Sequence, residues 1–462
     1  MRIRLIQPPL VQPRYRQLTL PVVGAELAAQ GLDVQTSDEN VEDVDLSGVD
    51  LVGITCHVYN APRAFELARS FRLRGIPVIL GGTFPTVAPE LVAPHCDSVV
   101  VGELEGQAAE LVGDARAGRL KPRYQAETPP SLAHTVRPDF SLLRSDRYLR
   151  FNFPLEVSRG CRFRCTFCTT HTLFPKPRTR SLADIERDLG QHDHGQVELI
   201  DVNFLNDPAF FKQVVPLLGA ADIPGWFGQT TVWDLADDPA LPELFAASRC
   251  RALFVGLETV TQEGLRSLHK QWSRLEAFRD VVQRYQDAGI LIQAGLIVGL
   301  DSDDPDVLAR TADLLEKLRV HTASVTFLHF YPGTKPYETL RREGRLLTED
   351  WRDLDGNRPT IRPTGMSVDS LKQEVRRFLE RMYSVRSIAR RGRHRGTRRF
   401  PSQLAHHLAI NTALRTYYKD LVRDWDRGPA AEERYMQRPP ESRTEQLVAN
   451  TSTRLIERLW KR

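Results

Sequence analysis

Three cysteines stand close together near the middle of the chain. They are Cys161, Cys165 and Cys168, and the surrounding segment reads SRGCRFRCTFCTTH. The spacing C-x3-C-x2-C allows one loop to turn three thiolates toward one point. Three thiolates can hold three irons of a cubane [4Fe-4S] cluster, and the fourth iron then lacks a protein ligand and can bind a small molecule. The motif therefore predicts a reactive iron–sulfur centre.

A zinc site is the alternative interpretation of the same loop. His171 extends the motif to C-x3-C-x2-C-x2-H, which would suit a structural Cys3His zinc site. The other three cysteines, Cys56, Cys96 and Cys250, are scattered through apolar segments. Such a distribution favours metal chemistry in the cytoplasm over a framework of disulfides.

Composition limits the class of protein. The chain has 462 residues, of which 41% are hydrophobic, enough for about three domains of roughly 150 residues. This excludes a disordered or collagen-like protein. The formal charge of +4 is too small to argue for a nucleic-acid partner. No stretch approaches the roughly 18 apolar residues of a membrane helix, so we expect no membrane span and a cytoplasmic location.

The first hundred residues alternate between strand and helix patterns, which is typical of a doubly wound parallel sheet. Because Gln7-Pro8-Pro9-Leu10 replaces G-x-G-x-x-G after the first strand, a nicotinamide or flavin dinucleotide is not expected. We assign a Rossmann-like domain to residues 1–118. The expected strands are 2–7, 33–37, 51–55, 78–80 and 98–101, and the expected helices are 21–30, 61–73 and 105–117.

Residues 119–150 are rich in proline and polar residues and are predicted to form a linker. A second unit, 151–347, predicts a partial or full β/α barrel (TIM-like), with its chemistry at the carboxyl ends of the strands. From residue 348 to 462 we expect a mostly helical C-terminal extension, with helices at 368–391 and 401–425. The expected barrel strands are 155–158, 198–203, 226–232, 252–256, 291–298 and 324–330.

The cysteine loop, with Phe167 before its third cysteine, resembles the motif of the radical S-adenosylmethionine (SAM) superfamily. Further segments on the predicted strands resemble the same family over roughly residues 150–347, and together they favour the cluster over zinc. These segments are IDVNFLNDP (200–208), WFGQTTV (226–232), FVGLET (254–259) with LHK (268–270), GLIVGLD (295–301), and YPGT (331–334) followed by EGRL (343–346).

The resemblance implies that the three cysteines hold a [4Fe-4S] cluster and that SAM binds the open iron through its amino and carboxylate groups. Val202 departs from the pattern, because relatives often carry a second acidic residue there. The alternative interpretation, ordinary packing of the barrel interior, applies to Gln229, Glu258, Ile297 and Gly299. The implied SAM-binding residues are Phe167, Asp201, Asn203, Gln229, Glu258, Ile297 and Gly299.

Two N-terminal segments, LGGTFPTVAPE (80–90) and CDSVVVGELEG (96–106), resemble the cobalamin-binding domain that precedes the barrel in one branch of this family. The segment after the first strand has no histidine to bind cobalt, and His57 is the nearest alternative. A degenerate Rossmann domain that binds nothing is the competing interpretation. The implied cobalamin contacts are Pro8, Thr55, Gly81, Gly82, Thr83, Phe84, which replaces a histidine of the family motif, Gly102 and Glu103.

The resemblance therefore implies a cobalamin-dependent radical SAM methyltransferase that moves a methyl group from methylcobalamin to an unactivated carbon of a small-molecule substrate. An electron donor such as flavodoxin or ferredoxin would be its partner. Cyclisation, ring contraction or oxidation is the first alternative. The second alternative is a non-catalytic cobalamin or iron–sulfur sensor, whose arginine-rich run 386–399 would bind nucleic acid. Nucleic acid is not expected, because no aromatic residues interleave with that run.

Overall fold

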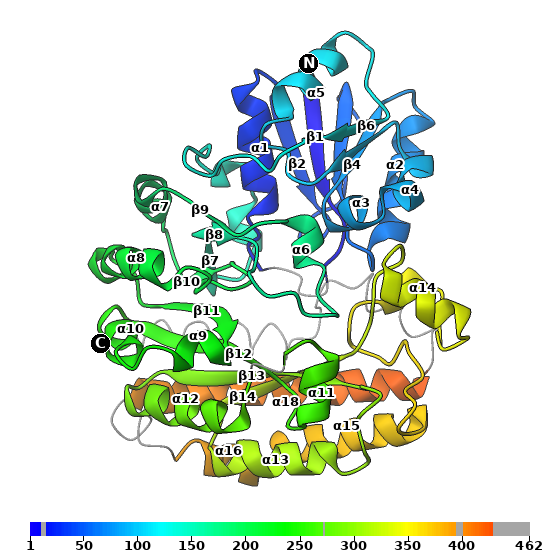
Figure 1. Ribbon diagram of the computed structural model, residues 1–462. Helices are drawn as coiled ribbons and strands as arrows, with labels where there is room; N and C mark the ends of the chain where they lie inside the picture. Colours follow the sequence, from blue (N-terminus) through cyan, green and yellow to red (C-terminus); the bar gives the residue numbers. More distant parts are fainter. Residues whose placement is uncertain (11–14, 271–272, 394–400, 428–462) are drawn as a thin grey trace.

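Two six-stranded parallel sheets, one above the other in Figure 1, form the framework of the protein. The computed structural model describes residues 1–10, 15–270, 273–393 and 401–427. Helices cover both faces of the first sheet, which explains why β1 (Arg2–Gln7) is buried at five successive positions. The α/β class expected from the alternating sequence pattern is confirmed.

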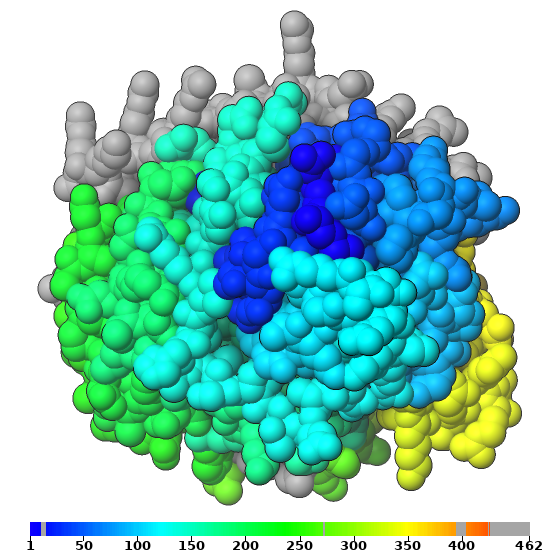
Figure 2. Space-filling view, turned by 90° about the horizontal axis from the view of Figure 1, so that it is seen from above, coloured from blue at the N-terminus to red at the C-terminus, as the bar shows by residue number. Residues whose placement is uncertain are grey.

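The first sheet has the strand order β2-β1-β3-β4-β5-β6. Helices α1 and α5 share a core with one face of the sheet, and α2, α3 and α4 share a core with the other face. The N-terminal residues, blue to cyan, fill the centre of the face seen in Figure 2. After β1, the elements are α1 (Thr19–Ala29), β2 (Asp33–Asp38), β3 (Leu51–Thr55), α2 (Ala61–Arg72), β4 (Val78–Gly81), α3 (Thr83–Val87), α4 (Pro89–Val92), β5 (Ser98–Val101), α5 (Ala108–Arg116) and β6 (Arg123–Gln125).

The segment predicted as a linker is not wholly irregular. Its residues Arg123–Gln125 form β6, which pairs in parallel with β5 at the edge of the first sheet. Tyr124 is buried, and its hydroxyl donates to Asp114 of α5 at 3.0 Å. Three residues are too few to show an alternating pattern, so this edge strand escaped the sequence analysis.

The second sheet has the order β14-β13-β12-β11-β10-β7 and is open, which agrees with the expected partial barrel. It begins with β7 (Asn152–Leu155), three residues earlier than predicted. Strand β10 (Gln196–Leu199) ends before the predicted 203, so Asp201 and Asn203 lie in the loop after it. The other strands are β11 (Trp226–Thr231), β12 (Cys250–Glu258), β13 (Leu291–Val298) and β14 (Thr322–Phe327).

Helices connect the strands of this partial barrel. Ser181, Asp207, Thr231 and Thr261 each cap the start of one helix with a side-chain oxygen. The helices are α7 (Leu182–Leu189), α8 (Pro208–Ala220), α9 (Val232–Ala236), α10 (Leu241–Ala247), α11 (Gln262–Ser267), α12 (Leu275–Asp287), α13 (Val307–Lys317) and α14 (Lys335–Arg342).

A small hairpin that the sequence analysis missed lies between the two sheets. Strands β8 (Ser158–Arg159) and β9 (Arg178–Thr179) pair in an antiparallel sense and enclose the cysteine loop, which also contains α6 (Thr170–Leu173). In Figure 1 this hairpin and α6 lie below the first sheet. Strands of two residues carry no sequence period, so their pairing is visible only in the structure.

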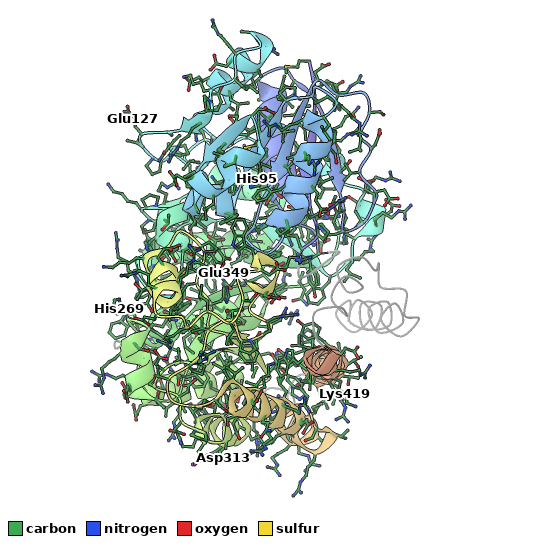
Figure 3. All side chains as sticks on the ribbon, turned by 90° about the vertical axis from the view of Figure 1, so that its right-hand side faces the viewer. His95, Glu127, His269, Asp313, Glu349 and Lys419 are labelled. Atoms are coloured by element: carbon green, nitrogen blue, oxygen red, sulfur yellow. The ribbon has the colours of Figure 1, made fainter. Side chains whose placement is uncertain are left out.

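The C-terminal helices pack against the second sheet, as the orange segment in Figure 1 shows. They are α15 (Val368–Met382), α16 (Val385–Arg391) and α18 (Pro401–Arg427). The single helix predicted over 368–391 is interrupted because Ser384 caps a new helix. In the side view of Figure 3, Lys419 on α18 lies far from His95 in the first domain.

The arginine-rich run 386–399 is not wholly a solvated surface, because one of its members lies in the interior. Arg391 is fully buried and donates to the backbone oxygens of Val320 at 3.0 Å and Met382 at 2.6 Å. Arg390 pairs with Glu316 at 3.3 Å. The first part of the run therefore attaches α16 to the partial barrel, and positions 394–399 lie outside the described residues.

The chain returns to the first domain after completing the second sheet. Tyr337 of α14 and Leu354 belong to the same buried core as Ile54 and Leu80 of the first sheet. Trp351 packs edge-on against Phe84 of α3, with ring centroids 4.9 Å apart. Residues that follow the last barrel strand therefore help to build the core of the N-terminal domain. None of the helices in the described part of the chain is long and apolar enough to cross a membrane.

Candidate cofactor sites

The β8–β9 hairpin and the loop after β10 shape the backbone that leads into the cysteine loop. Gly160 has a φ of +93°, and a Cβ atom there would lie 3.0 Å from the Lys176 oxygen, so this position requires glycine. The Asn206 side chain donates to the Gly160 oxygen at 2.6 Å and accepts from the Arg162 backbone at 3.0 Å. The start of the loop is thereby fixed on both sides of Cys161.

The three predicted cluster ligands lie close enough to influence one another. Burial, with a smaller contribution from the charges of neighbouring cysteines, raises the pKa of Cys161 and raises that of Cys165 to about 12. Hydrogen bonding from Asn203 acts in the opposite direction on Cys161. The Cys168 thiol donates to the Thr170 hydroxyl at 3.0 Å. Three interacting thiols on one loop are the donor set that an iron–sulfur cluster requires.

The zinc alternative requires three thiolates and His171 to surround one ion. Among the described residues, no group of three or more His, Cys, Asp or Glu side chains is placed to hold a single metal ion. Zinc binds each thiolate sulfur at about 2.3 Å, which draws its ligands tightly together. The three ligands of a [4Fe-4S] cluster bind three different irons and therefore stand farther apart. All six cysteines lie within the described residues and are free thiols.

Asp201 is fully engaged by the protein. Its carboxylate accepts hydrogen bonds from the Val157 backbone at 3.1 Å and the Ser158 hydroxyl at 2.5 Å, and from the Ser158 backbone. It is 3% exposed, and burial raises its pKa to about 7. A side chain in this position orients the strand before the cysteine loop, and its contact with SAM stays a prediction.

Asn203 occupies a buried polar cluster beside the start of the cysteine loop. Its amide donates to Asp234 at 2.8 Å, and its oxygen accepts from Thr230 at 2.7 Å. Asp234 also forms an ion pair with Arg162. Asp234 was not predicted, because a single acidic residue after the expected strand 226–232 belongs to no recognised motif.

Glu258 lies at the end of β12 with a φ of +63° and forms a buried ion pair with Lys270. The Lys270 ammonium lies 5.8 Å from the centre of the Phe167 ring, and its charge lowers the pKa of Cys165 against the effect of burial. Lys270 therefore belongs to the surroundings of the cluster. The L-x-K segment contained the signal for it, yet it was not among the predicted site residues.

The other predicted SAM residues fall into two settings. Phe167 packs against a small apolar cluster that contains Ile297, Leu268 and Leu300. Next to it, the Gly299 backbone donates to Asp303 at 2.9 Å. Gln229 is half-buried on β11. The structure thus brings Phe167, Ile297 and Gly299 to one side of the cysteine loop, where an apolar wall is available.

A cavity of about 310 Å³ lies between the first sheet and the cysteine-loop region. Thr55, Gly82 and Glu103 line it from the first domain, and Arg159 and Ile200 line it from the second. It extends between the sheet and α1, where the lining is apolar. Six of the eight predicted cobalamin contacts line this cavity: Thr55, Gly81, Gly82, Thr83, Gly102 and Glu103.

Two of the predicted cobalamin contacts lie elsewhere. Phe84 is fully buried in the core beneath Trp351, because α3 begins at Thr83 and turns the next side chain away from the cavity. The interpretation of Phe84 as a ligand contact is therefore wrong. Pro8 is not among the described residues that line the cavity. His57 accepts from or donates to the Thr83 hydroxyl at 2.9 Å, and burial lowers the pKa of its ring to about 4.

The cavity has two features that suit a large ligand rich in amide groups, such as cobalamin. The buried Thr55 hydroxyl has no hydrogen-bond partner within the described residues, although such groups are usually paired. Gly82 has a φ of +113°, and a Cβ atom there would lie 3.0 Å from the Cys56 oxygen. The contact with Cys56 thus requires glycine at position 82, and this residue lines the cavity without a side chain.

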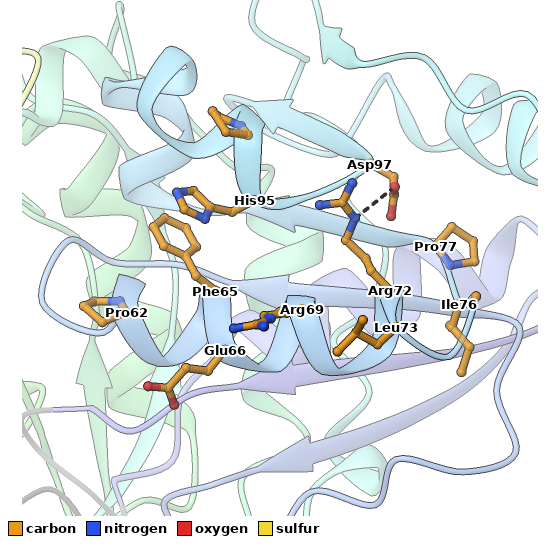
Figure 4. Close-up of a pocket in the computed structure, with 12 residues that line it drawn as sticks. Pro62, Phe65, Glu66, Arg69, Arg72, Leu73, Ile76, Pro77, His95 and Asp97 are labelled. Carbon is orange, nitrogen blue, oxygen red and sulfur yellow. Dashed lines mark hydrogen bonds and ion pairs between the residues drawn. The ribbon is translucent and has the colours of Figure 1, made fainter.

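A wider and shallower hollow of about 920 Å³ lies on the outer side of α2 (Figure 4). Phe65 stacks on His95 there with ring centroids 3.8 Å apart, and Arg72 pairs with Asp97 at 3.2 Å. None of the predicted site residues lines this hollow among the described residues. It is separate from the cavity between the domains.

Comparisons with known proteins agree with both halves of this arrangement. Residues 15–112 match the family model of the B12 binding domain, and residues 155–315 match that of the radical SAM superfamily. The bacteriochlorophyllide d C-12(1)-methyltransferase of Chlorobaculum tepidum is 27% identical over 383 residues, which cover 80% of this chain and 83% of the relative. The anaerobic magnesium-protoporphyrin IX monomethyl ester cyclase of Rubrivivax gelatinosus is 25% identical over 382 residues, covering 74% and 68%.

The fold is also shared with a solved structure. The radical SAM methyltransferase TsrM from Kitasatospora setae, described with cobalamin and a [4Fe-4S] cluster bound, superposes with a TM-score of 0.62 at 18% identity. The match covers 74% of this chain and 78% of that chain. The fold and the cysteine loop define a radical SAM enzyme. With its B12 binding domain, the chain belongs to the cobalamin-dependent radical SAM family, whose cofactors are SAM, a [4Fe-4S] cluster and cobalamin.

Proposed function

We propose that the protein is a methyltransferase that moves a methyl group from cobalamin to an unactivated carbon of a small-molecule substrate. The observation that carries the proposal is the shared cavity, which Thr55 and Gly82 line from one domain and Arg159 and Ile200 from the other. A methyl donor held there would face the region of the cysteine loop. The names of the relatives, most of which are methyltransferases, support the same reaction.

Each cofactor has residues proposed to hold it. Cys161, Cys165 and Cys168 hold the cluster, and Phe167 and Ile297 provide an apolar wall for the adenine of SAM. Gln229 and Glu258 are proposed to contact its polar groups. Cobalamin is held through the hydroxyls of Thr55 and Thr83 and through the closely approaching backbone of Gly81, Gly82 and Gly102. Bound together, these cofactors supply the radical that removes a hydrogen atom and the methyl group that replaces it.

The side chains of this chain position and shield the reactants. The ion pair between Glu258 and Lys270 neutralises charge beside the cysteines, and Leu268 and Ile297 keep water from the wall that faces Phe167. We propose that a flavodoxin-like or ferredoxin-like donor supplies the electrons. Holding the substrate between the two domains is the main contribution of the protein to the rate.

The test uses full-length protein that is loaded with cobalamin, reconstituted anaerobically and given SAM with a deuterated methyl group. We expect about four irons and about one cobalt per chain, formation of 5′-deoxyadenosine, and transfer of the deuterated methyl group to the substrate. Formation of 5′-deoxyadenosine with a converted but unlabelled product would favour cyclisation or oxidation, as the cyclase relative suggests. If neither 5′-deoxyadenosine nor labelled product forms, the proposal is wrong.

A further inference from the structure

A buried cluster of ion pairs connects the first domain to the base of the cysteine loop. Glu103, in the loop after β5, pairs through one carboxylate oxygen with Arg159 at 2.6 Å and through the other with Arg178 at 2.5 Å. The exposed fractions of these three side chains are 7%, 10% and 16%. Both oxygens of Glu103 are therefore occupied by arginines of the second domain.

The two arginines flank the cysteine loop on opposite strands. Arg159 of β8 and Arg178 of β9 are direct cross-strand partners, and the chain between them contains all three cluster cysteines. Two like charges opposite each other would force the strands apart. Glu103 lies between them and converts a repulsive pair into a bridge, so a residue of the cobalamin-binding domain closes the base of the loop.

Neighbouring contacts show which of these interactions is unique. Glu105 and Glu156 also pair with Arg159, each at 2.7 Å, so Arg159 keeps partners without Glu103. Arg178 also donates a hydrogen bond to the Pro130 oxygen at 2.6 Å, which carries no charge. Among the described carboxylates, Glu103 is the one that bridges both strands. Removing it would take away the direct ion-pair partner of the partly buried Arg178, on which the charge of Glu105 acts without direct contact.

We propose that Glu103 is a positioning residue that holds the cysteine loop against the cobalamin-binding domain and couples the order of the loop to cobalamin binding. Glu103 and its neighbour Gly102 both line the cavity between the domains. A ligand that stabilises this turn also stabilises the Glu103 bridge, and through it both strands of the hairpin. The proposal rests on the family's cofactors and is independent of the methyl-transfer proposal.

The test measures hydrogen–deuterium exchange of residues 160–177 in the cluster-loaded, full-length protein, with and without cobalamin and without substrate. In Glu103→Gln we expect the loop to exchange about tenfold faster than in the unaltered protein. Cobalamin slows exchange of the loop in the unaltered protein and does so less in the variant. Glu105→Gln is the matched control, because Glu105 contacts one strand only, and it changes loop exchange less than about threefold.

Three results would overturn the proposal. Unchanged loop exchange in Glu103→Gln would do so, whether or not the affinity for cobalamin falls. Loop exchange that cobalamin does not slow in the unaltered protein would also do so. Equal effects of the two glutamate variants would also overturn it. If Glu103→Gln does not fold, Arg178→Gln tests the same bridge from the other end and must accelerate exchange of the loop. Where both single variants fold, the double variant with Glu103→Gln and Arg178→Gln must accelerate loop exchange no more than the single variant with the larger effect.

Discussion

The Asp201 carboxylate accepts a hydrogen bond from the Ser158 hydroxyl at 2.5 Å inside the partial barrel. Ser158 begins β8, the short strand that leads into the cysteine loop, whereas Asp201 follows β10. The contact therefore ties the direction of the cysteine loop to a neighbouring strand of the sheet. Together with the Glu103 bridge, it fixes the base of the loop from two independent elements.

The first prediction concerns the charge of Asp201. Because burial raises its folded pKa to about 7, above the value of about 3.9 of an unfolded aspartate, the folded protein binds more protons between these pH values. Its contribution to stability is fully present below about pH 4 and is lost as pH rises to about 7, by up to about 1.4 kcal/mol per pH unit.

Chemical denaturation of Asp201→Asn and the unaltered protein at several pH values checks this prediction. The variant lowers the free energy of unfolding at low pH by about 1–3 kcal/mol, because an amide group faces a backbone donor, and it flattens the slope between pH 4 and 7. Equal slopes in the two proteins would show that Asp201 does not titrate in this range.

The second prediction concerns the ion pair beside the cluster. Lys270→Met removes a positive charge close to Cys165 and lowers the reduction potential of the cluster by about 40 mV, equivalent to about 1 kcal/mol for one electron. Glu258→Gln removes the negative partner and shifts the potential upward. The measurement is a redox titration followed by electron paramagnetic resonance without SAM, and shifts of the same sign in both variants would contradict the prediction.

The third prediction uses the free hydroxyl in the cavity between the domains. Thr55→Val keeps the shape of the side chain and removes a buried group that has no partner within the described residues. We expect the cobalamin-free protein to keep or gain up to about 1 kcal/mol of stability, while cobalamin binds about tenfold more weakly. Unaltered affinity in an absorbance titration would remove Thr55 from the cobalamin site.

The fourth prediction concerns the turn at the start of α3. Gly82→Ala places a methyl group 3.0 Å from the Cys56 oxygen at a positive φ, so we expect a loss of about 1–3 kcal/mol in stability and weaker cobalamin binding. Gly113→Ala in α5 is the control, because its Cβ meets nothing within 4 Å among the described residues. Thermal unfolding should show a gain of about 0.5–1 kcal/mol for that variant.

Local pattern was a good guide to most of the elements. Runs such as RIRLIQ and LVGIT have the length and β-branched character of buried parallel strands, and both form strands at the predicted positions. The end of β10 was misplaced because Asp201 and Asn203 alternate with Ile200 and Val202 as a strand would. Their side chains instead satisfy backbone and buried polar groups in a loop.

The site was predictable where one segment supplies all its parts and unpredictable where distant segments meet. The cysteine motif carries its own geometry within eight residues, whereas Glu103 meets Arg159 and Arg178 across more than fifty positions. Phe84 illustrates the opposite error, since a motif position suggested ligand contact and the helical turn at α3 directed the ring into the core. Such outcomes depend on tertiary packing, which a single sequence does not display.

The contact between Phe84 and Trp351 bears on how the two halves of the protein can move. The N-terminal domain is attached to the rest of the chain by the Glu103 bridge on one loop and by Trp351, Tyr337 and Leu354 in its core. Two attachments at different places on the N-terminal domain restrict its rotation relative to the rest of the protein. Rotation of one domain away from the other would break a buried ion-pair cluster and an aromatic contact at once. Entry of substrate and release of product would therefore depend on local rearrangement of loops.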